Sequence, residues 1–266
     1  MNMSAIARNN VKTRGGGPRA MVFAHGFGCD QNMWRHVAPA FEPDFRTVLF
    51  DHVGAGGSDL SAYHPAKYAG LAGYADDLVE IGRDLQLADA VFVGHSVSSM
   101  IGVLASLQAP GMFSELVLVG PSPRYIDDED DGYVGGFTAA QIDELLAFLT
   151  ENPTAWSQTM APAIMGNPDR PELGEELTAS FCRVDPAIAR DFARATFTAD
   201  NRADLPKVTA RALILQCSDD IVAPAAVGEY VSRAIPGGAL VRLDATGHCP
   251  NLSAPGEVID AIRAFV

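Results

Sequence analysis

Basic residues are few in this sequence. Lysine and arginine together number 19, against 33 aspartates and glutamates, and the formal net charge is −14 at pH 7. A protein that binds nucleic acid needs clustered lysine and arginine to neutralise phosphates, so this balance argues against nucleic acid as a partner. It also argues against anionic membranes and strongly anionic substrates.

Cysteine is scarce, and its spacing does not suggest a metal site. The four cysteines, Cys29, Cys182, Cys217 and Cys249, form no C-x-x-C pair, and the six histidines show no H-x-x-x-H spacing. We therefore expect no disulfide scaffold and no bound metal, and a reducing, cytoplasmic setting fits this pattern best.

Long apolar runs are missing as well. No stretch approaches the length of a membrane-spanning helix, and the first residues lack a basic segment followed by a long apolar run. We expect neither a membrane anchor nor a signal peptide.

The chain nevertheless has enough apolar residues for a large core, since 48% of its 266 residues are hydrophobic. Strand-like runs alternate with helical patterns, which is typical of an α/β fold with a mostly parallel sheet covered by helices on both faces. Strands are predicted at 6–11, 21–24, 47–50, 91–93, 116–119, 212–216 and 240–243, and helices at 74–85, 98–109, 227–234 and 257–265.

The middle of the chain breaks this alternation. From about 122 to 205 no strand is evident, and helices are predicted at 139–149, 154–165, 172–181 and 186–197. An insertion of this kind lies over the carboxyl ends of the strands, where open α/β sheets bind their ligands. We expect a hydrolase-like core at 1–121 and 206–266 and a four-helix cap at 122–205; a separate interaction module is the alternative.

The stretch VFVGHSVS at 91–98 has the layout of a nucleophile elbow. In such an elbow a strand turns sharply into a helix and lifts a serine hydroxyl clear of the backbone, so the flanking positions must be small. Gly94 meets this need, and Ser98 stands where the second glycine of G-x-S-x-G usually stands. Ser96 is therefore the candidate nucleophile.

A serine hydroxyl needs a base, and the base needs an orienting acid. His248 follows the last predicted strand and is the candidate base. Two acids, Asp219 and Asp220, follow the strand at 212–216; we favour Asp220 because the run DIVAP at 220–224 leads into the next helix. The order Ser96, Asp220, His248 is the chain order of α/β-hydrolases.

An acyl-transfer site also needs N–H donors for the developing oxyanion. The Val97 amide, directly after the nucleophile, is one candidate. The other is the Phe27 amide in HGFG at 25–28, where glycines allow a close approach of the backbone. The candidate substrate pocket comprises Phe27, His95, Phe137, Trp156 and Phe197, although most aromatic residues of the middle segment are equally explained by helix packing.

A second glycine-rich segment, DHVGAGGS at 51–58, contains G-x-G after a predicted strand. A dinucleotide site would need a helix to begin at once, whereas the following residues are typical of a loop. A structural turn near the active site is the better interpretation.

Together these motifs resemble the RsbQ-type α/β-hydrolases, a group that includes the plant karrikin and strigolactone receptors. The resemblance covers nearly the whole chain and is carried by FAHGFGCDQ at 23–31, DHVGAG at 51–56, GHSVS at 94–98, VGPSP at 119–123 and GHCP at 247–250. Ser98 matches the group, whereas His52 stands where tyrosine is common and Asp219 where a basic residue is frequent. The resemblance implies a four-helix cap over a small apolar pocket, weak hydrolysis of small esters or butenolide-like lactones, and often a signalling role with a protein partner.

The sequence thus predicts a serine hydrolase for a small apolar ester or lactone that needs no cofactor. Its main alternative is a ligand sensor with little turnover that acts through a regulatory protein partner. Cofactor-free perhydrolysis or C–C bond hydrolysis on the same scaffold is a further alternative.

Overall fold

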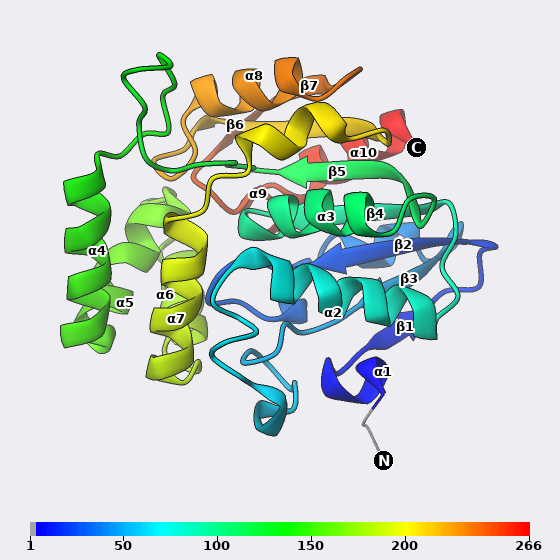
Figure 1. Cartoon of the computed structure of the whole chain (residues 1–266), viewed down its shortest axis with the longest axis horizontal. Helices are drawn as coiled ribbons and strands as arrows, with labels where there is room; N and C mark the ends of the chain where they lie inside the picture. Colours follow the sequence, from blue (N-terminus) through cyan, green and yellow to red (C-terminus); the bar gives the residue numbers. More distant parts are fainter. Residues whose placement is uncertain (1–3) are drawn as a thin grey trace.

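The computed structural model, which describes residues 4–266, contains a seven-stranded sheet in the order β1-β3-β2-β4-β5-β6-β7 (Figure 1). Only β1 pairs antiparallel, with β3; the other neighbours are parallel. The predicted α/β fold with a mostly parallel sheet is confirmed. The strands are β1 (Lys12–Arg14), β2 (Arg19–Ala24), β3 (Phe45–Leu49), β4 (Ala90–His95), β5 (Phe113–Val119), β6 (Arg211–Asp219) and β7 (Ala239–Thr246).

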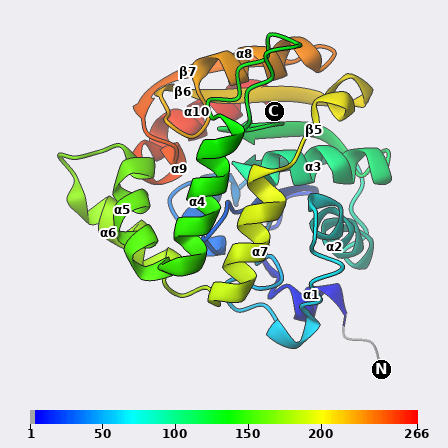
Figure 2. The same ribbon diagram turned by 60° about the vertical axis from the view of Figure 1, so that its left-hand side comes forward.

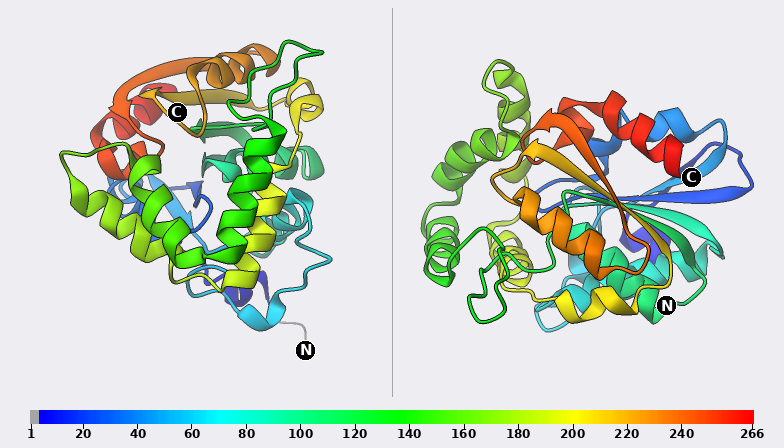
Figure 3. Two further views of the ribbon diagram at one scale, coloured as in Figure 1. Left: turned by 90° about the vertical axis from the view of Figure 1, so that its left-hand side faces the viewer. Right: turned by 90° about the horizontal axis from the view of Figure 1, so that it is seen from above.

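Helices cover both faces of the sheet (Figure 3). Because side chains alternate along a strand, Val22 of β2 packs with the helices of one face and Phe23 with those of the other. The first face carries α2 (Leu71–Asp84), α3 (Val97–Gln108) and α8 (Ala225–Ala234), and the second carries α9 (Pro250–Ser253) and α10 (Pro255–Phe265). The short 3₁₀ helices are η1 (Gln31–Trp34), η2 (Ala38–Phe41), η3 (Leu60–Ala62) and η4 (Arg202–Lys207).

Four helices between β5 and β6 gather at the end of the sheet where the parallel strands finish (Figures 1 and 2). They are α4 (Ala139–Glu151), α5 (Pro153–Met165), α6 (Pro171–Phe181) and α7 (Pro186–Phe197). Proline at the first position of three of them sets a helical φ where no N–H partner is needed. The predicted helices of this segment are confirmed, and the boundaries of the predicted cap at 122–205 stay a prediction.

Arginines tie together the two segments that connect these helices to the sheet. Arg124, on the segment after β5, lies 2.8 Å from Asp200, on the segment before β6. Arg202 in turn lies 2.8 Å from Asp128 and bonds Asp200 as well. These arginines hold the pKa of Asp200 well below its usual range, so the carboxylate stays charged. Ion pairs therefore join the connection that leads into α4–α7 to the connection that leads out of it.

The edge strand predicted at 6–11 is wrong. The short helix α1 (Ala5–Arg8) occupies the first half of this stretch, and the antiparallel edge strand β1 comes after it. Ser4 caps α1 with its hydroxyl, and Arg8 reaches across to Asp77 at 2.9 Å and Glu80 at 2.6 Å on α2. These ion pairs hold the segment against α2. They connect residues that are far apart in the sequence, so the local pattern of apolar residues could not predict them.

Within residues 4–266, no helix is both long and apolar enough to cross a membrane.

Candidate active site

Ser96 lies at the sharp turn between β4 and α3, in a backbone conformation that non-glycine residues rarely adopt. Its φ is 56° and its ψ is −124°. Gly94 makes this turn possible, because a Cβ at position 94 would lie 2.7 Å from the carbonyl oxygen of Ser98. Strain of this kind persists where the surrounding fold overdetermines the backbone, and it is typical of functional sites.

A continuous hydrogen-bonded chain runs from Ser96 through His248 to Asp220. His248 Nε2 lies 2.7 Å from Ser96 Oγ, and His248 Nδ1 lies 2.7 Å from Asp220 Oδ2. A carboxylate can only accept, so Nδ1 carries the proton and Nε2 is left to accept the serine proton. All three side chains are buried. The structure therefore brings together the three residues that the sequence singled out as a triad.

Asp220 is held in place by its own loop. Its Oδ1 accepts hydrogen bonds from the amides of Val222 at 2.8 Å and Ala223 at 3.1 Å, which leaves Oδ2 for His248. Burial opposes ionisation, but His248 and these two amides outweigh it and lower the pKa of Asp220. Asp219, the neighbouring candidate, is exposed, and its side chain makes no hydrogen bond or ion pair with His248 among the described residues. The geometry thus favours Asp220 as the acid.

The segment 25–28 lies directly against the nucleophile. A Cβ added at Gly26 would lie 2.5 Å from His95 Nδ1 and 3.4 Å from Ser96 Cβ, so only glycine allows this approach. The next amide is that of Phe27. Neither this amide nor that of Val97 donates a hydrogen bond to another residue within 4–266. The two predicted oxyanion donors are therefore unpaired N–H groups in the segments that flank Ser96.

Aromatic rings from α5, α6 and α7 gather around the ring of Phe27. The centroid distances from Phe27 are 6.0 Å to Trp156, 5.9 Å to Phe181, 5.7 Å to Phe192 and 6.1 Å to Phe197. Trp156 and Phe197, two of the predicted pocket residues, thus pack against Phe27, and their role in a substrate pocket stays a prediction. We call these five residues the Phe27 cluster.

Two other predicted pocket residues lie outside this cluster. Phe137 is partly exposed in the loop before α4, where its amide donates to the Tyr125 carbonyl at 3.2 Å. His95 is buried behind the turn, and its Nε2–H donates to the carbonyl of His248 at 2.7 Å. His95 therefore contacts the backbone of the candidate base rather than the rings.

Sequence reasoning listed Phe181 and Phe192 among the apolar residues of the middle segment without selecting them for the pocket, and it missed Tyr125. Phe181 and Phe192 fit the apolar faces of their helices equally well as ordinary packing residues, so periodicity alone could not single them out. Tyr125 follows the VGPSP motif after β5 and packs 5.0 Å from Phe197 between centroids. Burial raises the pKa of Tyr125 despite the opposing influence of nearby Ser96, and its hydroxyl has no partner within the described residues. A buried, unpaired hydroxyl near the nucleophile is a candidate contact for a bound polar atom.

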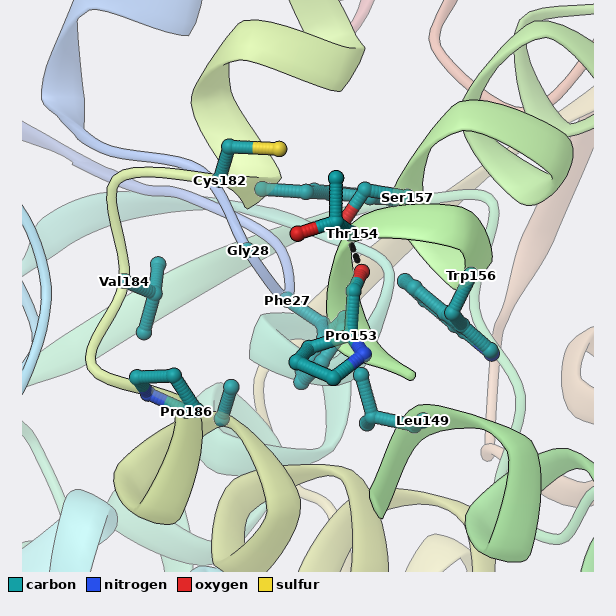
Figure 4. A pocket seen from close by; sticks show the side chains of 12 residues that line it. Phe27, Gly28, Leu149, Pro153, Thr154, Trp156, Ser157, Cys182, Val184 and Pro186 are labelled. Carbon is teal, nitrogen blue, oxygen red and sulfur yellow. Dashed lines mark hydrogen bonds between the residues drawn. The ribbon is translucent and has the colours of Figure 1, made fainter. Parts of the chain in front are cut away.

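A small pocket opens from the surface onto the Phe27 cluster (Figure 4). The volume of this pocket is about 80 Å³. Figure 4 shows Cys182 and Val184, on the α6–α7 connection, facing Pro153 and Thr154 at the start of α5. Three members of the Phe27 cluster line this pocket: Phe27, Trp156 and Phe181. Ser96 is not among the residues that line the pocket.

Burial of His95 has a consequence for stability. Burial, together with neighbouring His248, lowers the pKa of His95 to about 3, whereas an unfolded histidine titrates near ~6.5. Between these values the unfolded chain binds a proton that the folded chain does not. The free energy of unfolding is therefore expected to fall as the pH is lowered through this window, by up to about 1.4 kcal/mol per pH unit for this group. Urea denaturation between about pH 5 and pH 7.5 measures the slope.

A matched pair of variants measures how much of this pH slope is due to His95. In His95→Gln an amide can still donate to the His248 carbonyl but does not titrate, so the slope is expected to become shallower. In His64→Gln, which replaces an exposed histidine, the slope should stay that of the wild type. Equal slopes in the wild type and His95→Gln would contradict the prediction. His25 and His52, whose pKa values are also lowered by burial, account for part of the remaining slope.

The comparisons with known proteins agree with this geometry. The model of the alpha/beta hydrolase family matches residues 21–261. A probable esterase from Oryza sativa subsp. japonica is 39% identical over 260 residues, which cover 97% of this chain and 95% of the relative. The karrikin insensitive 2 receptor CA from Petunia hybrida is 37% identical over 259 residues, again 97% and 95% of the two chains. The predicted resemblance to the plant receptors is confirmed.

Solved structures give the same result. A hydrolase from Oleispira antarctica superposes with a TM-score of 0.95 at 39% identity, covering 98% of this chain and 95% of that one. Because the family model and these relatives span almost the full length of the sequence, the chain belongs to the alpha/beta hydrolase family.

Proposed function

We propose that this protein is a serine hydrolase that cleaves a small apolar ester or lactone through an acyl-enzyme. The observation that carries the proposal is the hydrogen-bonded chain Ser96–His248–Asp220, with 2.7 Å at each step. Relatives named as esterases along nearly the whole chain support the same class of reaction.

In the proposed mechanism, Ser96 Oγ attacks the carbonyl carbon while His248 Nε2 takes its proton. The Phe27 and Val97 amides donate to the oxygen that becomes negatively charged. The tetrahedral intermediate collapses, the bond to the leaving oxygen breaks, and His248 gives the proton to that oxygen. Water, deprotonated by His248, then attacks the acyl-enzyme and releases the acid and free Ser96. For a lactone, the acid and alcohol leave as one hydroxy acid.

The Phe27 cluster supports an apolar substrate of limited size. Its five side chains are phenylalanine or tryptophan, so they offer apolar surface and no charge to a ligand. Helices α5–α7, which provide four of these rings, act as a cap at the carboxyl ends of the strands. Tyr125 provides a buried hydroxyl at the edge of this apolar surface for one polar group of the ligand.

Hydrolysis of a p-nitrophenyl ester series, from acetate to octanoate, tests the proposal. We expect kcat/KM to be highest for the shortest acyl chains and to fall by about 10-fold or more towards octanoate, because longer chains must displace the packed rings. A fluorophosphonate probe should label the protein once, and peptide mapping should place the label on Ser96.

Either of two outcomes would contradict this assignment: a label on a residue other than Ser96, or no turnover of any ester in the series. Rising activity towards octanoate would instead contradict only the limit on substrate size. Denatured protein serves as the control for hydrolysis that needs no folded site.

A second function, ligand sensing, is favoured by one observation: a relative that matches 97% of the chain is named as a receptor. In this function the same triad would hold a signal molecule, and α4–α7 would contact a regulatory protein partner. Very slow turnover together with a ligand-dependent rise in Tm would favour sensing over metabolic hydrolysis. Fast multiple turnover without such a rise would exclude it.

A further inference from the structure

Three buried polar side chains lie behind the loop that carries the Phe27 amide. Ser98 Oγ–H donates to the carbonyl oxygen of His25 at 2.5 Å. His52 Nε2 lies 2.8 Å from Ser98 Oγ and 3.2 Å from the same carbonyl. The backbone N–H of His52 donates to His25 Nε2 at 3.0 Å. Two elements thus contact His25, the residue directly after β2: the segment after β3, through His52, and α3, through Ser98.

The hydrogen bonds fix the protonation of both rings. His25 Nε2 accepts from the His52 amide, so the His25 proton is on Nδ1, which donates to the Gly26 carbonyl at 2.9 Å. His52 Nε2 faces a carbonyl oxygen and a hydroxyl whose proton is already given to that carbonyl. It must therefore carry the proton of its ring and donate to Ser98 Oγ. Every donor in this part of the network has an acceptor.

The surroundings of His52 keep it neutral and fixed. The rings of Phe50, Tyr74 and Phe192 pack edge-on to it at centroid distances of 5.2, 5.6 and 5.9 Å. Its Nδ1 is buried without a partner in the described structure, as is the hydroxyl of Tyr74. Burial lowers the pKa of His52 well below its usual value, so the ring acts as a neutral donor through Nε2.

The anchored carbonyl is two residues before the candidate oxyanion donor. Gly26, between them, is pressed against His95 and Ser96, so the loop has little room to adjust there. We infer that His52 and Ser98 are positioning residues that hold the His25 carbonyl and thereby aim the Phe27 N–H at the oxyanion. The inference rests on the proposed function, because it gives the loop a role in acyl transfer. Neither residue touches the substrate in this account.

Three substitutions and one control test the network. Ser98→Ala removes the bridging hydroxyl, and His52→Phe removes the ring donor at similar size. Each is expected to lower kcat for p-nitrophenyl acetate by about 10- to 100-fold with KM nearly unchanged, because a misplaced donor weakens the transition state more than substrate binding. His52→Gln keeps an N–H donor and should recover most of kcat. The pH profile should keep its shape in all variants, since His248 is untouched.

Ser99→Ala is the matched control. Ser99 is a buried hydroxyl on the same helix, but it donates to the carbonyl of Gly94 at 3.1 Å and does not reach the 25–28 loop. Ser99→Ala, like Ser98→Ala, removes one buried hydroxyl from α3, and its kcat should stay within about 3-fold of the wild type. A drop in Ser99→Ala equal to that of Ser98→Ala would mean that loss of any buried hydroxyl explains the effect and would overturn the inference.

Hydrogen exchange of the loop amides decides the inference independently of catalysis. In Ser98→Ala and His52→Phe two hydrogen-bonded amides should exchange about 10-fold faster than in the wild type and Ser99→Ala. They are the amide of Gly26, which donates to Met33 Sδ at 3.4 Å, and the backbone amide of residue 52, which donates to His25 Nε2 at 3.0 Å. Unchanged exchange in both variants would overturn the inference even if esters are hydrolysed. A wild type without Ser96-dependent turnover but with faster loop exchange in the variants would overturn the proposed function alone, leaving His52 and Ser98 as anchors of the loop.

Discussion

Replacing Ser96 with alanine is expected to lower kcat for p-nitrophenyl acetate by about 10⁶-fold, to the small activity that binding and oxyanion donors alone provide. The hydroxyl that His248 Nε2 contacts at 2.7 Å is the nucleophile in the proposed mechanism, and alanine offers nothing to attack the carbonyl. His248 and Asp220 keep their mutual hydrogen bond in this variant, so the loss measures the nucleophile and not the collapse of the site. Spectrophotometric release of p-nitrophenol, corrected for the spontaneous hydrolysis of the ester, measures the loss down to that background rate.

A second substitution at the same position separates chemistry from folding. Ser96→Gly also lacks the hydroxyl and should be equally inactive. Because the residue holds φ at 56°, a conformation that suits glycine, this variant should gain about 1 kcal/mol of unfolding free energy relative to Ser96→Ala. Turnover in either variant at the wild-type rate would mean that another group attacks the ester. Equal stability of the two would mean that the turn stores no strain.

The sheet could be predicted from the sequence because buried parallel strands have a strong local signal. The run at 91–93 predicts β4 (Ala90–His95), and that at 212–216 predicts β6 (Arg211–Asp219), each as a short apolar segment flanked by helical patterns. The helix α1 could not be predicted in the same way. It depends on the Ser4 cap and on ion pairs from Arg8 to a helix about 70 residues further along.

The candidate triad could be predicted because the topology of the sheet largely determines where its three residues lie. In a parallel sheet the loops after β4, β6 and β7 all emerge at one edge, so Ser96, Asp220 and His248 are brought together by position. The choice between Asp219 and Asp220 rests on the local turn towards α8. The structure gives a physical reason for it, because two backbone amides of this turn donate hydrogen bonds to Asp220 Oδ1.

The rings around Phe27 could be predicted only in part. Helical periodicity shows which side chains of α5–α7 face inwards, but which of them meet depends on how the helices cross. Phe181 and Phe192 join the cluster for that reason, and Phe137 does not because its loop pairs with the segment around Tyr125. The His52–Ser98–His25 network was likewise hidden, since three buried polar residues from distant segments leave no periodic signal.

Asp220→Asn is expected to lower kcat by about 10⁴-fold, the second largest effect in this protein. An aspartate that accepts from His248 Nδ1–H keeps Nε2 free for the serine proton. An asparagine held by the Val222 and Ala223 amides through its oxygen would turn its NH₂ group towards His248. The ring would then carry its proton on Nε2, which cannot accept from Ser96. The rate at which a fluorophosphonate probe labels Ser96 should fall in parallel with kcat.

Asp219→Asn is the matched control, because it makes the same change one residue away. Its side chain is exposed, and its link to the His248 loop runs through its backbone carbonyl, which accepts from the Gly247 amide at 2.7 Å and survives the substitution. Activity within about 2-fold of the wild type is expected. The opposite pattern, with Asp219→Asn inactive and Asp220→Asn active, would reassign the acid. Loss in both variants with folding intact would mean that the negative charge of the loop, rather than the tautomer of His248, governs the reaction.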